Sequence, residues 1–186
     1  MKRLSVLLCL MLLLCGCSET QKEMDRAMAL RTKLLGSQEC TFTAEITADY
    51  GDKTYEFSLD CVGDTEGDLR FTVQRPDTIA GITGMISEEN GALTFDDVVL
   101  YFEHLADGQV TPVSAPWILI HTLRGGYIIA CTMEDNLLHL TIDDSYQEDA
   151  LRLEVWLNEE NVPVHTDIIW KNRRILSINI IDFRIL

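Results

Sequence analysis

The chain has 186 residues, with 15 Lys and Arg against 30 Asp and Glu, and a formal net charge of −15 at pH 7. This length is typical of one domain, and the 47% of hydrophobic residues is enough for a packed core. The acidic excess argues against a nucleic-acid-binding protein, because such proteins need a basic surface.

The N-terminus has the features of a bacterial export signal. Lys2 and Arg3 precede an apolar run over 4–14, which is shorter than the roughly 20 residues of a membrane span. The following Leu14-Cys15-Gly16-Cys17 resembles the lipobox, in which the last Cys is acylated after the signal is cleaved. An ordinary secretory signal with an incidental cysteine is the alternative. The resemblance implies a signal peptide over 1–16 and a fatty-acyl group such as palmitate on Cys17.

This leader determines the expected location and domain organisation. Lipid on Cys17 would anchor the protein to the cell membrane on its extracytoplasmic side, since acyl chains insert into the bilayer. We expect residues 17–24 to form the lipidated N-terminus and a short tether, and residues 25–186 to form a single domain. Without the leader, 13 basic residues face 30 acidic ones, a net charge of −17 that favours solubility or a basic partner.

The first predicted element is a helix over 20–35. Its Met- and Ala-rich apolar residues recur at spacings of three and four, and Gly36 provides a stop. We expect this helix to pack on a sheet. A flexible, Met-lined lid over an apolar cavity is the alternative interpretation.

A hairpin is predicted next, between Cys40 and Cys61. Apolar residues alternate with polar ones on both strands, which is typical of a sheet with one buried face; they are Phe42, Ala44, Ile46 and Ala48, then Tyr55, Phe57 and Leu59. Antiparallel pairing keeps the sum of paired residue numbers constant. A sum of 101 places the two cysteines opposite each other, at a Cα separation that a disulfide accepts. A sum of 103 uses a two-residue Gly51-Asp52 turn and separates them.

The preferred prediction is the sum of 101, with a disulfide between Cys40 and Cys61. Disulfides persist outside the cytoplasm, and a loop of this length would be stabilised by roughly 3 kcal/mol. Two free buried thiols are the first alternative. A metal site is the weaker alternative, because no His or second Cys pair has ligand spacing. Cys131 is expected to be a small buried hydrophobic residue.

The rest of the chain predicts more strands and one more helix. Strands are expected at 69–74, 79–86, 93–100, 138–142, 151–157, 164–170 and 174–183. A short helix over 116–124 starts with Pro116 and ends before Gly125-Gly126. It is apolar almost all round and should therefore be buried. The fold class is mainly β (α+β): a large curled antiparallel sheet, or incomplete barrel, of about ten strands with an N-terminal helix and a buried mid-chain helix.

This order of elements resembles the LolA/LolB-like lipoprotein-carrier superfamily. The resemblance rests on the initial helix, the Phe42-x-Ala44-x-Ile46 strand, the Arg75-Pro76 pair, the helix at 116–124 and the closing hairpin at 163–183. It implies a curled sheet closed by helices and an apolar binding cavity. Gram-positive spore and germination lipoproteins share the fold. Carriers hold a closed lid with a buried Arg, for which Arg70 and Arg75 are candidates by region.

The sequence predicts a binding role and no catalytic residues. It lacks nucleophile-elbow, zincin and phosphate-loop motifs, and His104, His121, His139 and His165 are scattered without ligand spacing. We therefore expect no enzyme activity, cofactor or metal. The first functional hypothesis is a lipid or other apolar ligand bound by Phe42, Ile46, Phe57, Leu59, Trp117 and Ile120. The alternative is a membrane-anchored interaction module that binds a cell-envelope protein. The volume of the interior cavity discriminates between them.

Overall fold

The computed structural model describes residues 17–87, 93–95, 106 and 110–186. It contains two α-helices, two 3-10 turns and ten strands in this range. The bounds are α2 Cys17–Gly36, β1 Glu39–Asp49, β2 Thr54–Asp64, β3 Leu69–Arg75, η1 Asp77–Ile79, β4 Thr83–Ile86, β5 Leu93–Phe95, η3 Pro112–Ser114, α3 Ala115–Gly125, β6 Tyr127–Glu134, β7 Leu137–Asp143, β8 Arg152–Leu157, β9 Pro163–Trp170 and β10 Arg173–Ile185.

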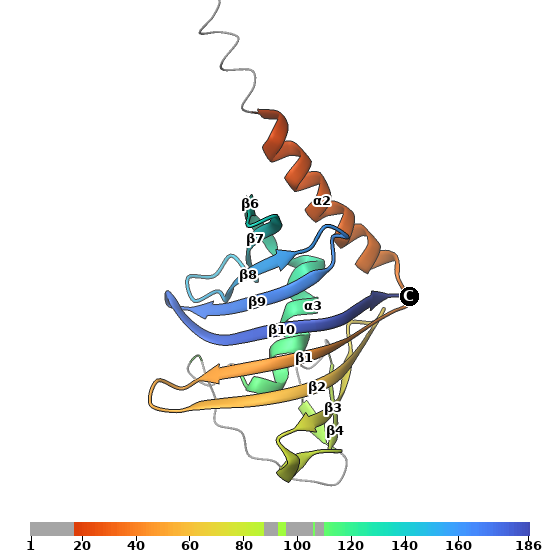
Figure 1. Ribbon diagram of the computed structural model, residues 1–186, viewed down its shortest axis with the longest axis vertical. Coiled ribbons are helices and arrows are strands. Elements are labelled where there is room, and N and C mark those ends of the chain that lie inside the picture. Colours follow the sequence, from red (N-terminus) through yellow and green to blue (C-terminus); the bar gives the residue numbers. More distant parts are fainter. Residues whose placement is uncertain (1–16, 88–92, 96–105, 107–109) are drawn as a thin grey trace, which may run out of the picture.

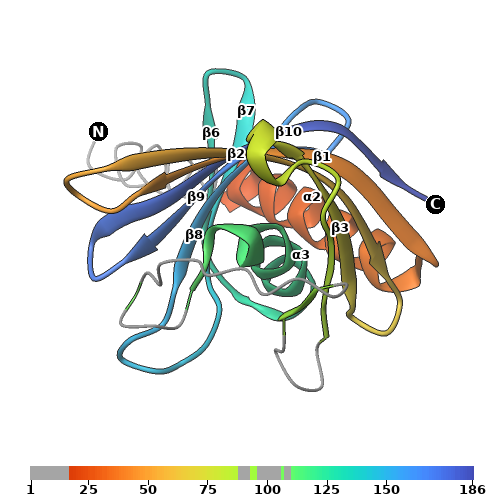
Figure 2. The same ribbon diagram turned by 90° about the horizontal axis from the view of Figure 1, so that it is seen from below.

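All ten strands form one antiparallel sheet in the order β5-β4-β3-β2-β1-β10-β9-β8-β7-β6. The C-terminal strand β10 joins the two halves, because it pairs with β1 on one side and with β9 on the other. The sheet curls around α3, as Figure 2 shows, and α2 runs along the β6 side (Figure 1). The predicted fold class is therefore confirmed.

Alternating side chains place the core on the concave face of the sheet. On β1 every even-numbered residue from Cys40 to Ala48 is buried, and β7 and β8 alternate in the same way. The period-two pattern thus predicted the buried side chains of β1, β7 and β8, whereas Tyr55, expected on the buried face of the hairpin, is exposed near the start of β2. The largest fully buried side chains of the sheet include Leu59, Leu138, Leu140, Ile142, Leu153 and Ile168.

The register of the first hairpin corrects the disulfide prediction. Phe42 lies opposite Cys61 and Cys40 lies opposite Gly63, a sum of 103 rather than 101. The turn is the tight one with Gly51-Asp52 at its tip; Tyr50 N–H donates to the Lys53 carbonyl, and Gly51 has a φ of +96°. Such a φ suits glycine, and the two-residue turn sets the register.

The two cysteines are therefore diagonal neighbours, and both are free thiols in the structure. A two-residue offset puts Cα atoms roughly 7–8 Å apart, beyond the reach of an unstrained disulfide. The Sγ of Cys40 instead fills the space above Gly63, 3.0 Å from where a Cβ would stand. Cys131 is buried, as predicted.

Other boundaries differ from the predictions by a few residues. Helix α2 begins at Cys17 instead of Thr20, so the residues expected as a tether form its first turns. The strand expected at 79–86 divides into η1 and the shorter β4. The signal peptide over 1–16 and residues 96–100 of another expected strand lie outside the described residues. Neither described helix is long and apolar enough to cross a membrane.

Candidate functional site

Helix α3 fills the concave side of the sheet. In the 3-10 turn η3 that leads into it, the Thr111 N–H donates to the Ser114 Oγ, and Pro116 lies in the first turn of α3. Seven of its eleven residues are buried: Ala115, Pro116, Ile118, Leu119, Ile120, Thr122 and Leu123. A helix this apolar is stable in water only while the sheet covers it.

Side-chain hydrogen bonds attach α3 to α2. Arg31 of α2 donates from Nε to the Leu123 carbonyl at 2.8 Å and from Nη2 to the Gly126 carbonyl at 2.7 Å. These carbonyls belong to the C-terminal end of α3, where the last backbone carbonyls have no N–H donors within the helix and a cation is favoured. Burial lowers the pKa of Arg31 from its ordinary value, yet the guanidinium remains charged.

Two further hydrogen bonds attach α3 to the turn between β2 and β3. Trp117 Nε1 donates to the Gly67 carbonyl at 3.0 Å, and Arg124 Nη2 donates to the Asp64 carbonyl at 2.6 Å. Both acceptors are backbone oxygens of one turn. The described contacts of α3 therefore combine apolar packing with a few side-chain bonds to backbone carbonyls.

The predicted ligand-binding residues come from β1, β2 and α3 and contribute to one core. Phe42, Ile46, Leu59 and Ile120 are buried, and Phe57 and Trp117 are partly buried and packed against it. The interior is occupied, because side chains from the sheet, α2 and α3 form one continuous core. These residues are thus brought together around packed side chains.

A pocket opens at the rim, between α3, the end of α2 and the β2–β3 turn. It has a volume of about 230 Å³ and is lined by Leu35, Thr65, Gly67, Ile120, His121, Arg124 and Gly125. Pockets that enclose a drug-sized ligand measure roughly 300–1,000 Å³. An acyl chain would therefore need room that α3 now occupies.

The arginines that hold α3 are not the two that the sequence suggested by region. Arg70 is exposed, and Arg75 forms an ion pair of 2.7 Å with Glu45 instead of contacting α3. Arg31 and Arg124 hold the helix instead. Helical spacing gave a partial signal for Arg31, because this residue lies on the apolar stripe of α2.

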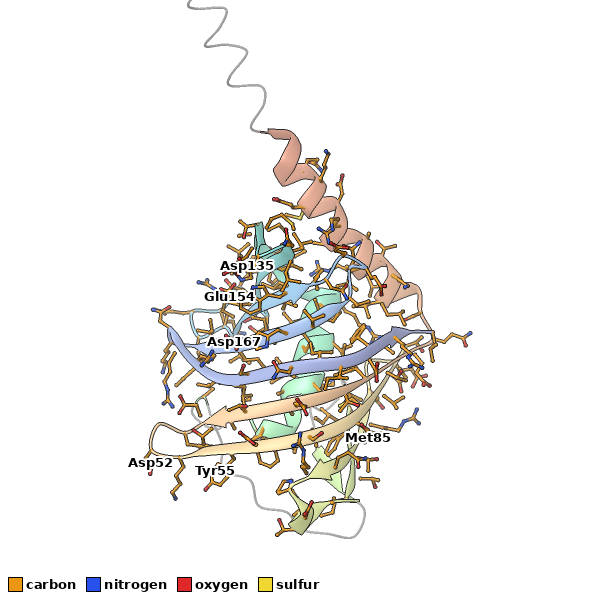
Figure 3. The ribbon with its side chains drawn as sticks, in the orientation of Figure 1. Asp52, Tyr55, Met85, Asp135, Glu154 and Asp167 are labelled. Carbon is orange, nitrogen blue, oxygen red and sulfur yellow. The ribbon has the colours of Figure 1, made fainter. Side chains whose placement is uncertain are left out.

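A row of polar side chains crosses the outer face of the sheet. The ring of His139 on β7 stacks on Trp156 of β8 at 4.6 Å, and Trp156 contacts His165 of β9 at 5.1 Å. Nε2 of His139 lies 2.6 Å from a carboxylate oxygen of Glu154. Figure 3 labels Glu154 and Asp167 on these neighbouring strands. Both ring nitrogens of His165 have hydrogen-bond partners, whereas Nε2 of His139 lies beside Glu154 but makes no hydrogen bond among the described residues. His104 lies outside the described residues.

His165 and Asp167 form a hydrogen-bonded pair in this row, and the pKa values of both members are shifted. Hydrogen bonding to Asp167, at 3.2 Å, and then to Asn179, at 2.8 Å, raises the pKa of His165 above its ordinary value. Burial alone would raise the pKa of Asp167. The hydrogen bonds from His165 and Ser177 and the charge of His165 reverse this effect and lower the pKa.

Cys40, Cys61 and Cys131 are buried in the core as free thiols. Burial raises the pKa of Cys61 well above its ordinary value and raises the pKa values of Cys40 and Cys131 as well. The thiolate is the reactive form, so all three thiols should react slowly while the protein is folded. In the described part of the chain, no group of three or more His, Cys, Asp or Glu side chains is arranged to hold a metal ion.

Comparison with known proteins gives structural neighbours. No protein-family model and no curated protein matches the sequence. A solved LolA superfamily protein from Nitrosomonas europaea is 8% identical, with a TM-score of 0.39, and the match covers 86% of this chain and 93% of that one. A protein from Vibrio parahaemolyticus, described as an outer membrane lipoprotein-sorting domain, is also 8% identical, with a TM-score of 0.42 and coverage of 90% and 93%.

A DUF1329 family protein from Desulfovibrio piger is similar at the same level, with 9% identity, a TM-score of 0.41 and coverage of 89% and 92%. Two of these neighbours are thus described as a LolA superfamily protein and a lipoprotein-sorting domain, at TM-scores below 0.5.

Proposed function

We propose that this protein is a membrane-anchored extracytoplasmic lipoprotein that binds an apolar ligand, such as an acyl chain, between its curled sheet and α3. The observation that supports this most is the construction of α3. The helix is buried on most sides, yet Arg31, Trp117 and Arg124 attach it through side-chain bonds to backbone carbonyls. The role is one of binding and not of catalysis.

Ligand entry requires α3 to shift relative to the sheet, so that an acyl chain can lie between them. Leu119 and Leu123 of α3 are buried against the sheet, and burying each large aliphatic side chain contributes about 1.5–3 kcal/mol. The helix shifts only if another apolar surface replaces these contacts. An acyl chain supplies such a surface, so ligand binding and helix displacement would be coupled.

The proposal also includes a lipid anchor on Cys17, which would set the position of the domain at the membrane. Acylation of Cys17 would hold the domain at the outer side of the membrane, close to lipids and to other lipoproteins. The net charge of −17 after removal of the leader would keep the domain from lying flat on an anionic bilayer. The opening to the interior would then remain accessible from the aqueous side.

The test measures lipid binding by the full chain carrying Cys17→Ser, so that its own lipid does not interfere. The probe is 1-monolauroylglycerol, and complexes are detected by native mass spectrometry. Arg31→Met should increase the bound fraction severalfold, because weaker attachment of α3 makes the open state more populated. Arg75→Met is the matched control, since Arg75 pairs with Glu45 away from α3. Absence of binding in both the parent chain and Arg31→Met would overturn the proposal.

The filled interior favours a second candidate, an anchored interaction module that binds a cell-envelope protein and no lipid. The packed core leaves a rim pocket of about 230 Å³, and the acidic surface suits a basic partner. Under this proposal, lipid would bind neither the parent chain nor Arg31→Met. The delipidated protein would capture one specific envelope protein, and that complex would weaken as salt concentration rises.

A further inference from the structure

The rim pocket is lined by a guanidinium and an imidazole on a strongly acidic protein. His121 and Arg124 line it from one face of α3, while Ile120 forms its inner wall. No carboxylate is among the side chains that line it. This combination is notable because 30 of the 186 residues are acidic.

Arg124 has hydrogen-bonding capacity that the described residues leave unused. Its Nη2 donates to the Asp64 carbonyl, but its buried Nε has no hydrogen-bond partner among the described residues. A buried donor without an acceptor costs about 1–3 kcal/mol, and more on a charged group. An anionic oxygen in the pocket would satisfy it once a shift of the Arg124 side chain exposes Nε.

The acidic β2–β3 turn beside the pocket is held by hydrogen bonds between its own residues. One oxygen of the Asp64 carboxylate accepts the backbone N–H groups of Glu66 and Asp68, both at 3.0 Å. This carboxylate is therefore engaged within the β2–β3 turn, while the backbone carbonyl of Asp64 binds Arg124. His121 stacks on Trp117 at 4.8 Å, which fixes its ring at the pocket.

Ile120 connects the pocket with the interior. It is buried, and its Cγ2 approaches β2 at Gly63, 3.9 Å from where a Cβ would stand. A ligand with its polar end beside Arg124 would therefore direct an apolar tail past Ile120 toward the core. The volume of about 230 Å³ suits a head group, whereas a whole lipid would not fit.

We propose that this pocket binds the anionic head group, a carboxylate or phosphate, of an amphiphile whose tail occupies the interior. The inference rests on the proposed function and adds the chemical class of the ligand. Arg124 supplies charge-assisted hydrogen bonds, and His121 adds a further donor at the rim. Phosphate and carboxylate share this recognition chemistry, so both head groups belong to the predicted class.

The experiment compares probes that have the same tail. Laurate and lauroyl lysophosphatidic acid carry an anionic head group, and 1-monolauroylglycerol carries a neutral one. Affinities are measured by calorimetry below the critical micelle concentrations, on the full chain carrying Cys17→Ser. We expect the anionic probes to bind roughly tenfold more tightly than the neutral probe.

Variants locate the effect. Arg124→Gln should reduce the anionic-to-neutral affinity ratio to near one; any loosening of α3 affects both probes and cancels in the ratio. His121→Gln leaves the bond between Arg124 and Asp64 intact and should lower the ratio partly. His139→Gln, on the outer face, is the control and should keep the ratio of the parent chain. Thermal unfolding confirms that each variant is folded.

The outcomes separate this inference from the proposed function. Equal affinity for anionic and neutral probes would overturn the head-group site but leave apolar binding intact. Absence of binding by every probe would overturn both. Inorganic phosphate alone is the last probe: if it binds as tightly as lauroyl lysophosphatidic acid, the pocket is a site for small anions and the head-group proposal is wrong.

Discussion

Replacing Arg31 by Met should loosen α3 without unfolding the sheet. The change removes two hydrogen bonds, of 2.8 and 2.7 Å, to the Leu123 and Gly126 carbonyls, while the apolar stem of the side chain is kept. Hydrogen bonds to charged groups contribute roughly 1.5–3 kcal/mol each, and partial solvent access lowers this value. We expect about 2 kcal/mol in total, which corresponds to about 30-fold more frequent opening of α3.

Hydrogen exchange with mass spectrometry measures this opening. Peptides that cover Ala115–Gly125 should exchange about 30-fold faster in Arg31→Met, while peptides from Pro163–Trp170 in β9 should be unchanged. Arg75→Met, which breaks an exposed ion pair, should leave α3 unchanged. Equal acceleration in α3 and β9, or no acceleration in α3, would refute the view that Arg31 holds α3 as a separable element.

Three more predictions concern the sheet and its core. Gly84→Ala should lower the melting temperature by several degrees, since a Cβ there would stand 2.4 Å from the Phe71 ring; an unchanged value would contradict this packing. The raised pKa of His165 stabilises the fold below pH about 6.5, and this contribution is lost as pH rises through the folded-state pKa. The stability difference between the parent and His165→Gln should therefore narrow toward high pH, and a constant difference would be inconsistent with the pair to Asp167. Finally, alkylation of the denatured, unreduced protein should label Cys40, Cys61 and Cys131, whereas a bridge between Cys40 and Cys61 would leave Cys131 as the only one of these three that is labelled.

The sheet was predictable because its signal is local. Alternation of apolar and polar residues over seven or more positions determines which face of a strand is buried, and β1 and β7 show this directly. The short helix between Pro116 and Gly125 was likewise evident from its apolar content and its flanking residues. Each of these elements carries its own start, stop and buried face in the sequence.

The register of the first hairpin was harder to predict, because two registers keep the same faces buried. A shift of two residues leaves Phe42 and Leu59 on the core side in either case, so hydrophobicity cannot distinguish the registers. The presence of a cysteine at each end favoured the wrong one. The tight turn at Gly51-Asp52 decides the register, and the close fit of Cys40 over Gly63 is visible only in the packed structure.

The candidate site was predictable only in its apolar half. Residues such as Phe42 and Ile120 follow from strand and helix periodicity. The contacts of Arg31 and Arg124 depend on how α2 and the β2–β3 turn meet α3, and their acceptors are backbone carbonyls. Every residue has a backbone carbonyl, so the sequence does not reveal which carbonyls accept these bonds. For this reason Arg70 and Arg75 were predicted in place of Arg31 and Arg124.

Native mass spectrometry of the full chain carrying Cys17→Ser, purified gently from a bacterial envelope, tests the central claim most directly. We expect an added mass in the lipid range that is lost on denaturation. The fraction of protein that carries this mass should be larger for Arg31→Met than for the parent chain. A bare protein mass for both, before and after incubation with monolauroylglycerol, laurate and lauroyl lysophosphatidic acid, would contradict it. The filled interior would then be a permanent core.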